Sequence, residues 1–199
     1  VNIVFVKTLR RYFVTKTKCT CMLNLQCLPA RIVFDVFIGQ EYTATMKIKK
    51  AYKFRLKPTQ AQVALLEKYV GACRFLWNKV LEINLRRLQN KQPLLWYHEA
   101  DYWSKVWKAS EEYGFLKEVP AHCLQQKLKD LMRAFKDGFD KKQPLKRLPR
   151  FKKRGLGDSI RFPEPKQFIL NNRRIKLPKL GWLGFFKSRA MEGELRNAT

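Results

Sequence analysis

The chain has 199 residues, which is enough for one domain or two small ones with a hydrophobic core. Its 46% hydrophobic and 13% aromatic content excludes general disorder. The formal net charge of +26 would destabilise a compact protein without a polyanion nearby, and nucleic acid is the commonest such partner. An anionic membrane would favour a basic amphipathic helix or a lipidation motif, and the sequence has neither.

The cysteines indicate reduced thiols. Five of them form no disulfide framework, and the cluster of Cys19, Cys21 and Cys27 lacks a neighbouring histidine or a second C-x-x-C, so it makes a poor zinc site. The apolar stretches are too short to span a membrane, and residues 1–30 lack the ordered regions of a signal peptide. We therefore expect a cytoplasmic chain, with no membrane partner and no cofactor or metal of its own.

Residues 1–45 differ from the rest. They contain β-prone patches such as "IVFV" and "RIVFDVFIG", but no regular period and no capping signal. Strong patterning begins only at Met46, which favours an N-terminal extension, translated from leader sequence. An ordinary N-terminal β-hairpin is the alternative.

Residues 46–58 predict a strand. The stretch "KIKKAYKFRL" alternates between apolar and basic residues, so that Lys49, Lys53 and Arg55 share one face and only Lys50 interrupts the other. The apolar face consists of Ile48, Tyr52, Phe54 and Leu56.

Residues 59–140 predict three helices. The first begins after Thr59, which with Gln62 forms a capping box. The third begins near Pro120, and Lys127, Lys129, Arg133 and Lys136 lie off its apolar stripe. The apolar stripes of these two helices are Val63, Leu66, Val70, Cys73, Trp77 and Val80, and Leu124, Leu128, Leu131, Phe135 and Phe139.

The second helix lies within "LLWYHEADYWSKVW". Trp103, Val106 and Trp107 fall on one of its faces. Aromatic residues at this density are more often core than platforms for stacking bases, so we expect this face to be buried.

A basic, proline-broken stretch, "PLKRLPRFKKRG" (144–155), follows the helices. Short β-like pieces come next, with Gly181 and Gly184 suited to turns or a bulge. The order of strand, helices and strands predicts an α+β fold, in which a helical insertion interrupts a small antiparallel sheet or partial barrel.

Four stretches carry a family resemblance. They are "KAYKFRLKPTQAQVALLEKYVGACRFLWN" (50–78), "LQQKLKDLMRAFKDGF" (124–139), "LPRFKKRG" (148–155) and "KLPKLGW" (176–182). In this order they resemble the N-terminal part of the TnpB, or OrfB, proteins of insertion sequences, once called transposases. The resemblance covers essentially everything after Met46 and nothing before it.

The resemblance implies a partial wedge-type β-barrel interrupted by a three-helix recognition lobe that is helix-turn-helix-like. The lobe would be residues 59–140, and the basic stretch and remaining wedge strands residues 141–199. Full-length members are RNA-guided DNA endonucleases, with a RuvC-like nuclease that binds divalent metal and carries a zinc module. The sequence ends at "MEGELRNAT", before that nuclease. We therefore expect no catalytic residues and no enzyme activity in this chain, with both metals in the missing C-terminal half.

The basic stretch is then expected to grip phosphates of a guide RNA or of its heteroduplex with target DNA. Phe151 would anchor the stretch on the core; the alternative is a solvated, charged loop. The cations concerned are Lys146, Arg147, Arg150, Lys152, Lys153 and Arg154.

Position in the family motifs adds Arg74 and Asn78, although Arg74 could equally form a salt bridge or cap a helix. It also places His122 and Gln125 near the double-stranded DNA that flanks the target, where glutamine can pair with adenine. A surface histidine with no such role is the alternative for His122.

The implied partners are guide RNA, double-stranded DNA and the nuclease half. Two other functions stay open. One is a helix-turn-helix DNA-binding protein that acts in transposition or regulation without guide RNA. The other is a structural, ribosome-associated protein, which explains the charge but not the family motifs.

Overall fold

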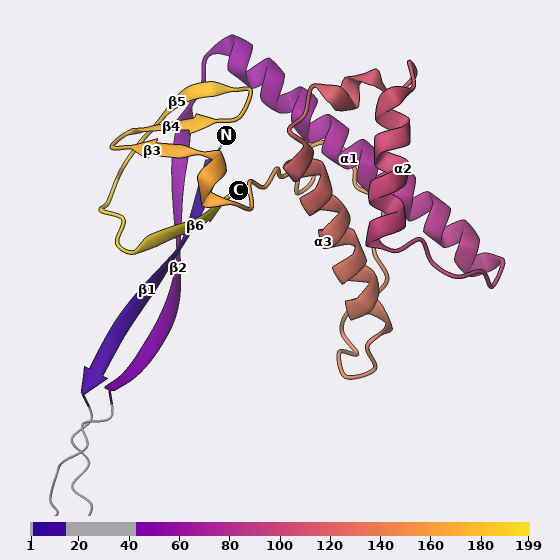
Figure 1. The fold of residues 1–199 in the computed structure, drawn as a ribbon, viewed down its shortest axis with the longest axis horizontal. Coiled ribbons are helices and arrows are strands. Elements are labelled where there is room, and N and C mark those ends of the chain that lie inside the picture. The colour runs from indigo at the N-terminus through magenta and orange to yellow at the C-terminus, as the bar shows by residue number, and fades with distance from the viewer. Residues whose placement is uncertain (1, 15–42) are drawn as a thin grey trace, which may run out of the picture.

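The computed structural model describes residues 2–14 and 43–199, which form a curled sheet and a separate group of helices (Figure 1). The chain order is β1 (Asn2–Val14), β2 (Thr43–Lys57), α1 (Gln60–Gln89), α2 (Tyr97–Ala109), η1 (Gly114–Lys117), α3 (Ala121–Phe139), η2 (Pro165–Gln167), β3 (Ile169–Asn171), β4 (Arg174–Leu177), β5 (Gly181–Phe185) and β6 (Glu194–Ala198).

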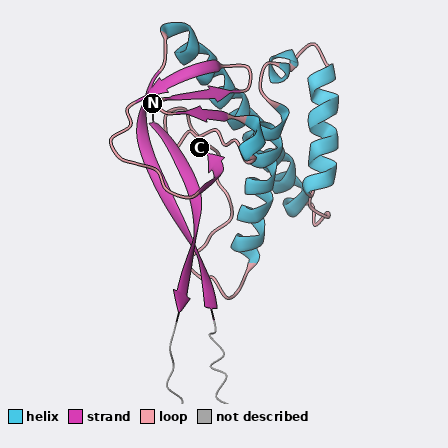
Figure 2. Ribbon diagram, turned by 60° about the vertical axis from the view of Figure 1, so that its left-hand side comes forward, coloured by secondary structure: helices cyan, strands magenta, loops and turns pink. Residues whose placement is uncertain are grey.

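The six strands form one antiparallel sheet in the order β3-β4-β5-β2-β1-β6, so the helices are inserted between strands that lie side by side. Figure 2 shows how the sheet curls. Phe162, which precedes β3, forms a bridge with Ala198 of β6, and its N–H donates to the Ala198 carbonyl over 2.8 Å. The predicted α+β fold with a helical insertion in a partial barrel is therefore confirmed.

Strand β2 has the predicted alternation. Tyr52, Phe54 and Leu56 are buried, and their neighbours Lys53 and Arg55 are exposed. The strand begins at Thr43, three residues before the predicted start at Met46, because its first residues pair with the far end of β1.

Strand β1 is an inner strand of the sheet. It pairs with β2 along its whole length and with β6 on its other side (Figure 1). Phe5 is fully buried, with its ring 6.0 Å from that of Phe54 and 5.6 Å from that of Phe185. Residues 2–14 thus form an antiparallel pair with β2, and the origin of residues 1–45 as an appended extension stays a prediction. The cysteines at 19, 21 and 27 lie outside the described residues.

Helix α1 begins with the predicted capping box. The Gln62 N–H donates to the Thr59 hydroxyl over 3.4 Å, and the Thr59 N–H donates to the Gln62 side chain over 3.0 Å. Its stripe packs against α3, whose buried residues include Leu124, Leu128 and Leu131. None of the helices in the described ranges is long and apolar enough to cross a membrane.

Two predictions about the helices are wrong. Trp103 and Val106 are each 40% exposed, because α2 packs through its small residues Ala100 and Ser104; of the predicted face, only Trp107 is partly buried against the core. Phe139 is 48% exposed because it is the last residue of α3; its ring stacks on that of Phe135, with the centroids 6.2 Å apart.

Candidate nucleic-acid interface

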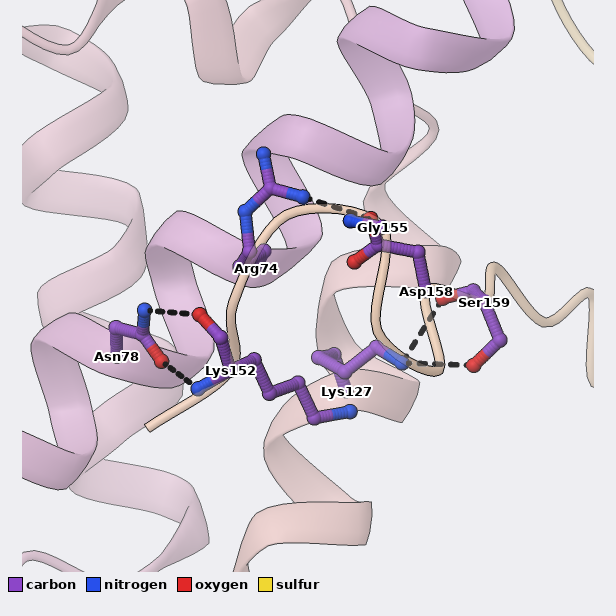
Figure 3. Close-up of polar contacts among 7 residues, drawn as sticks. All are labelled: Arg74, Asn78, Lys127, Lys152, Gly155, Asp158 and Ser159. Atoms are coloured by element: carbon purple, nitrogen blue, oxygen red, sulfur yellow. Dashed lines mark hydrogen bonds and ion pairs between the residues drawn. The ribbon is translucent and has the colours of Figure 1, made fainter. Parts of the chain in front are cut away.

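Residues 144–155, called the basic segment here, follow α3 in the chain and are bonded to side chains of α1; Figure 3 shows the part of the segment around Lys152 and Gly155. The segment contains no helix or strand, so its backbone groups need other partners. Side chains of α1 supply several of them.

Asn78 bonds both backbone groups of Lys152. Its amide nitrogen donates to the Lys152 carbonyl over 3.0 Å, and its amide oxygen accepts from the Lys152 N–H over 2.8 Å. The neighbouring Trp77 indole donates to the Arg150 carbonyl over 3.1 Å. These three bonds fix the path of the segment along α1, and Figure 3 shows the two that Asn78 forms.

Arg74, one turn earlier on α1, holds the end of the segment. Its guanidinium lies 2.8 Å from the Asp158 carboxylate, and the same carboxylate oxygen accepts from the Gly155 N–H over 2.8 Å (Figure 3). Gly155 and Gly157 have φ values of +80° and +65°, a backbone conformation that glycine adopts without strain. Arg74 therefore forms the salt bridge that we weighed as its alternative role.

Lys152 turns inward. Its ammonium lies 4.1 Å from the centroid of the Trp77 ring, and burial together with the charge of Lys127 lowers the pKa of Lys152. Lys127, predicted to lie off the core of α3, is only 5% exposed. It can be buried because its ammonium donates to the Ser159 carbonyl over 3.0 Å (Figure 3). Lys152 is thus less available to an outside phosphate than its neighbours.

The other cations of the segment face solvent. Lys146 is half-exposed and lies 2.6 Å from the Asp137 carboxylate. Four more are exposed, and no ion pair within the described ranges involves them: Arg147, Arg150, Lys153 and Arg154.

The predicted anchor, Phe151, is 53% exposed, so that prediction is wrong. The bonds from Trp77 and Asn78 hold the backbone of the segment, and its one aromatic ring is left outside.

A cleft of about 930 Å³ opens beside this end of the segment. Its wall includes Val63 and Leu66 of α1, Val4 of β1, Arg154, and the Arg74–Asp158 pair. The cleft is thus lined by both apolar and charged side chains.

The remaining predicted contacts lie on other elements. Lys49, Lys53 and Arg55 are exposed on β2. His122 is exposed and Gln125 is partly exposed, both in the first turns of α3. The structure thus brings Arg74 and Asn78 to the basic segment, but leaves the other two groups on β2 and α3.

Sequence reasoning missed Trp77, Asp158 and Lys127 as parts of this site. A signal was present for Trp77, because a tryptophan on an apolar stripe still needs an acceptor for its indole N–H. Among residues 2–14 and 43–199, no three His, Cys, Asp or Glu side chains are grouped closely enough to hold a metal ion.

The comparisons with known proteins agree with the family motifs. Residues 46–92 match the OrfB-type helix-turn-helix domain. The chain is 38% identical over 154 residues to InsQ of Escherichia coli (strain K12), whose name describes it as a candidate RNA-guided DNA endonuclease. It is 36% identical over 133 residues to a Streptomyces pristinaespiralis protein with the same description. The chain belongs to the TnpB/OrfB family.

The two alignments cover 77% and 67% of this chain, but only 38% and 32% of those relatives. The chain thus spans less than two fifths of the length of the TnpB/OrfB relatives that it matches. In the structure, the matched range 46–92 comprises nearly all of β2 and the single helix α1. The helix-turn-helix description therefore corresponds here to a strand followed by one long helix.

Proposed function

We propose that this chain is the nucleic-acid-binding N-terminal part of a TnpB-like RNA-guided DNA endonuclease, which binds guide RNA and the DNA that flanks the target. The observation that carries the proposal is the basic segment, whose backbone is bonded to α1 while its unpaired cations face solvent. A solvated loop would not need those buried or half-buried partners.

A fixed row of cations suits a polyanion with a regular backbone. Each phosphate that such a cation neutralises releases condensed counterions, and holding the segment in place lowers the entropy lost on binding. Contacts of this kind position a nucleic acid without reading its sequence. In our proposal the base pairs between guide and target supply the sequence specificity.

The DNA that flanks the target would meet the first turns of α3. Gln125 can bond two edge atoms of adenine in the major groove, and His122 is exposed beside it in the sequence. In this proposal the curled sheet is the wedge, and its face with Lys49, Lys53 and Arg55 is a second phosphate-binding surface.

Cleavage is assigned to a different part of the protein. The resemblance places the carboxylates that bind divalent metal, and the zinc module, C-terminal to the matched region. We expect the 199-residue chain to bind nucleic acid without cutting it in Mg²⁺, because two-metal hydrolysis needs those carboxylates. Guide-dependent cutting by the purified chain would contradict this.

The helix-turn-helix match favours one other candidate function, a DNA-binding protein that acts in transposition or regulation without a guide. A gel-shift competition separates the two. Our proposal expects a structured RNA from the 3′ end of the insertion element to displace a labelled duplex from the chain. A duplex site that resists this RNA would support the guide-free alternative instead.

A further inference from the structure

The outer face of the sheet exposes two large aromatic rings. Trp182 of β5 is 44% exposed, and Phe186, directly after β5, is 50% exposed. Residues 182, 184 and 186 alternate with the buried Leu183 and Phe185, so both rings and Gly184 share one face.

Cations flank both rings. Lys176 pairs with Trp182 across the β4–β5 ladder, and Arg174 pairs with Gly184. Lys57 of β2 pairs with Gly184 from the other side, and its ammonium lies 3.7 Å from the centroid of the Phe186 ring. Gly184 lies between the two rings, along about 13 Å of strand, and has no side chain of its own; a Cβ there would lie 3.6 Å from the Cβ of Lys57.

The surrounding sequence is free of negative charge. Residues 166–191 contain seven basic residues and no Asp or Glu. An apolar surface meant for a protein partner is usually depleted of charge at its centre, and lysine is rare there. Exposed rings between unbalanced cations fit a ligand with flat, apolar faces along an anionic backbone.

We propose that this face binds unpaired nucleotides of a single strand, with Trp182 and Phe186 as stacking platforms and Lys57, Arg174 and Lys176 as phosphate contacts. Aromatic rings stack on any base, and so bind a single strand without choosing its sequence. A duplex keeps its bases stacked inside and cannot use the rings. The inference rests on the proposed nucleic-acid binding but concerns a different surface from the basic segment.

The test uses fluorescence anisotropy of the full chain with a labelled 12-nucleotide single-stranded oligouridine and with a 12-base-pair duplex. We expect Trp182→Ala to weaken single-strand binding by about tenfold or more, with an unchanged salt slope and duplex affinity within twofold. Trp182→Tyr should keep most of the affinity. Trp103→Ala on α2, with a similarly exposed ring of 40%, is the matched control and should change nothing.

The phosphate contacts are tested separately, by the salt dependence of single-strand binding. Arg174→Ala with Lys176→Ala should flatten the slope of log K against log salt for the single strand by about 1.4, or 0.7 for each phosphate. The inference is overturned if Trp182→Ala binds the single strand like the parent, or loses single strand and duplex equally. If the parent binds neither nucleic acid, the proposed function itself fails.

Discussion

Asn78 helps to hold the basic segment on α1, because its side-chain amide forms hydrogen bonds with both backbone groups of Lys152. Asn78→Ala leaves both groups without a protein partner, and we expect the free energy of unfolding to fall by about 1–3 kcal/mol. Hydrogen exchange at the Lys152 amide should accelerate more than at the α1 amides. Asn171→Ala, at an exposed position in β3, is the control and should cost less than about 0.5 kcal/mol.

The thiols of Cys73 and Cys123 should be inert in the folded chain. Burial raises the pKa of Cys73 to about 11 and of Cys123 to about 12. Each pKa unit above the working pH lowers the thiolate fraction about tenfold. At pH 8, alkylation of these two residues should therefore be at least about 100-fold slower than in the denatured chain, as read by peptide mass spectrometry. Equal rates would show that the two thiols are not buried.

The same thiols make stability depend on pH. Both pKa values are raised in the folded state, so above about pH 8.5 the unfolded chain loses protons that the folded chain keeps. Their contribution to stability is complete below that pH and is lost as pH rises towards 11–12. Cys73→Ser with Cys123→Ser should reduce the fall in melting temperature between pH 8.5 and 10. An unchanged fall would mean that other groups cause it.

At the residue scale, the sequence predicted which side chains of the site are charged better than it predicted where each side chain points. Asn78 was expected at nucleic acid because its motif resembles the family's, yet its amide is bonded to the segment 74 positions further along the chain. In the sequence, Lys152 is indistinguishable from the other five cations of the basic segment, but in the structure its ammonium lies over the Trp77 ring. Sequence patterns reveal which residues share a face within one helix or strand. These contacts join residues that are far apart in the sequence, so no such pattern could predict them.

At the scale of elements, two glycines in helices should respond to alanine with opposite signs. Alanine in a helix interior normally stabilises by about 0.5–1 kcal/mol over glycine. At Gly71 of α1 a Cβ would meet only the Arg74 side chain, at 3.9 Å, so Gly71→Ala should stabilise. At Gly138 of α3 it would lie 3.1 Å from backbone atoms of Arg147 and Leu148.

Gly138→Ala should therefore push the basic segment away from α3 and lower the free energy of unfolding by about 1–3 kcal/mol. Thermal melts of both variants, followed by circular dichroism, measure the difference. If Gly138→Ala stabilises as much as Gly71→Ala, the segment does not pack against α3 as described.

A substitution in β1 tests whether the N-terminal residues contribute to the stability of the fold. Phe5 is fully buried between Phe54 and Phe185, so Phe5→Ala should cost about 3–5 kcal/mol of unfolding free energy in a denaturant titration. Ile169→Ala, at a 55% exposed position of the same sheet, should cost less than about 0.5 kcal/mol. Equal, small costs would support an appended leader, as expected from the sequence.

The elements with a long, regular hydrophobic pattern or a clear capping motif were predictable from the sequence. The capping box at Thr59 and the alternation of β2 correspond to the observed start of α1 and the burial along β2. The exposure of Trp103 and Val106 on α2 was not predictable, because a run of aromatic residues has the same sequence pattern whether its side chains are buried or exposed. The role of residues 2–14 in the sheet was hidden because their partner strands are distant in sequence.

At the scale of the whole molecule, the net charge of +26 favours binding to a polyanion, and the central claim is that the basic segment contacts this polyanion. The decisive measurement is the salt dependence of RNA binding. Two variants each lose four exposed cations. One replaces those of the basic segment with alanine: Arg147, Arg150, Lys153 and Arg154. The control replaces four on the helices that are likewise exposed and outside the ion pairs of the described residues: Lys117, Lys129, Arg133 and Lys136.

Both variants have the same net charge, so they differ only in where the charge was removed. The account predicts that the slope of log K against log salt flattens by about three in the segment variant and by less than one in the control. Affinity should fall alike for every RNA sequence, because phosphate contacts carry no sequence information. Equal slopes in the two variants would show that the basic segment is only a solvated surface.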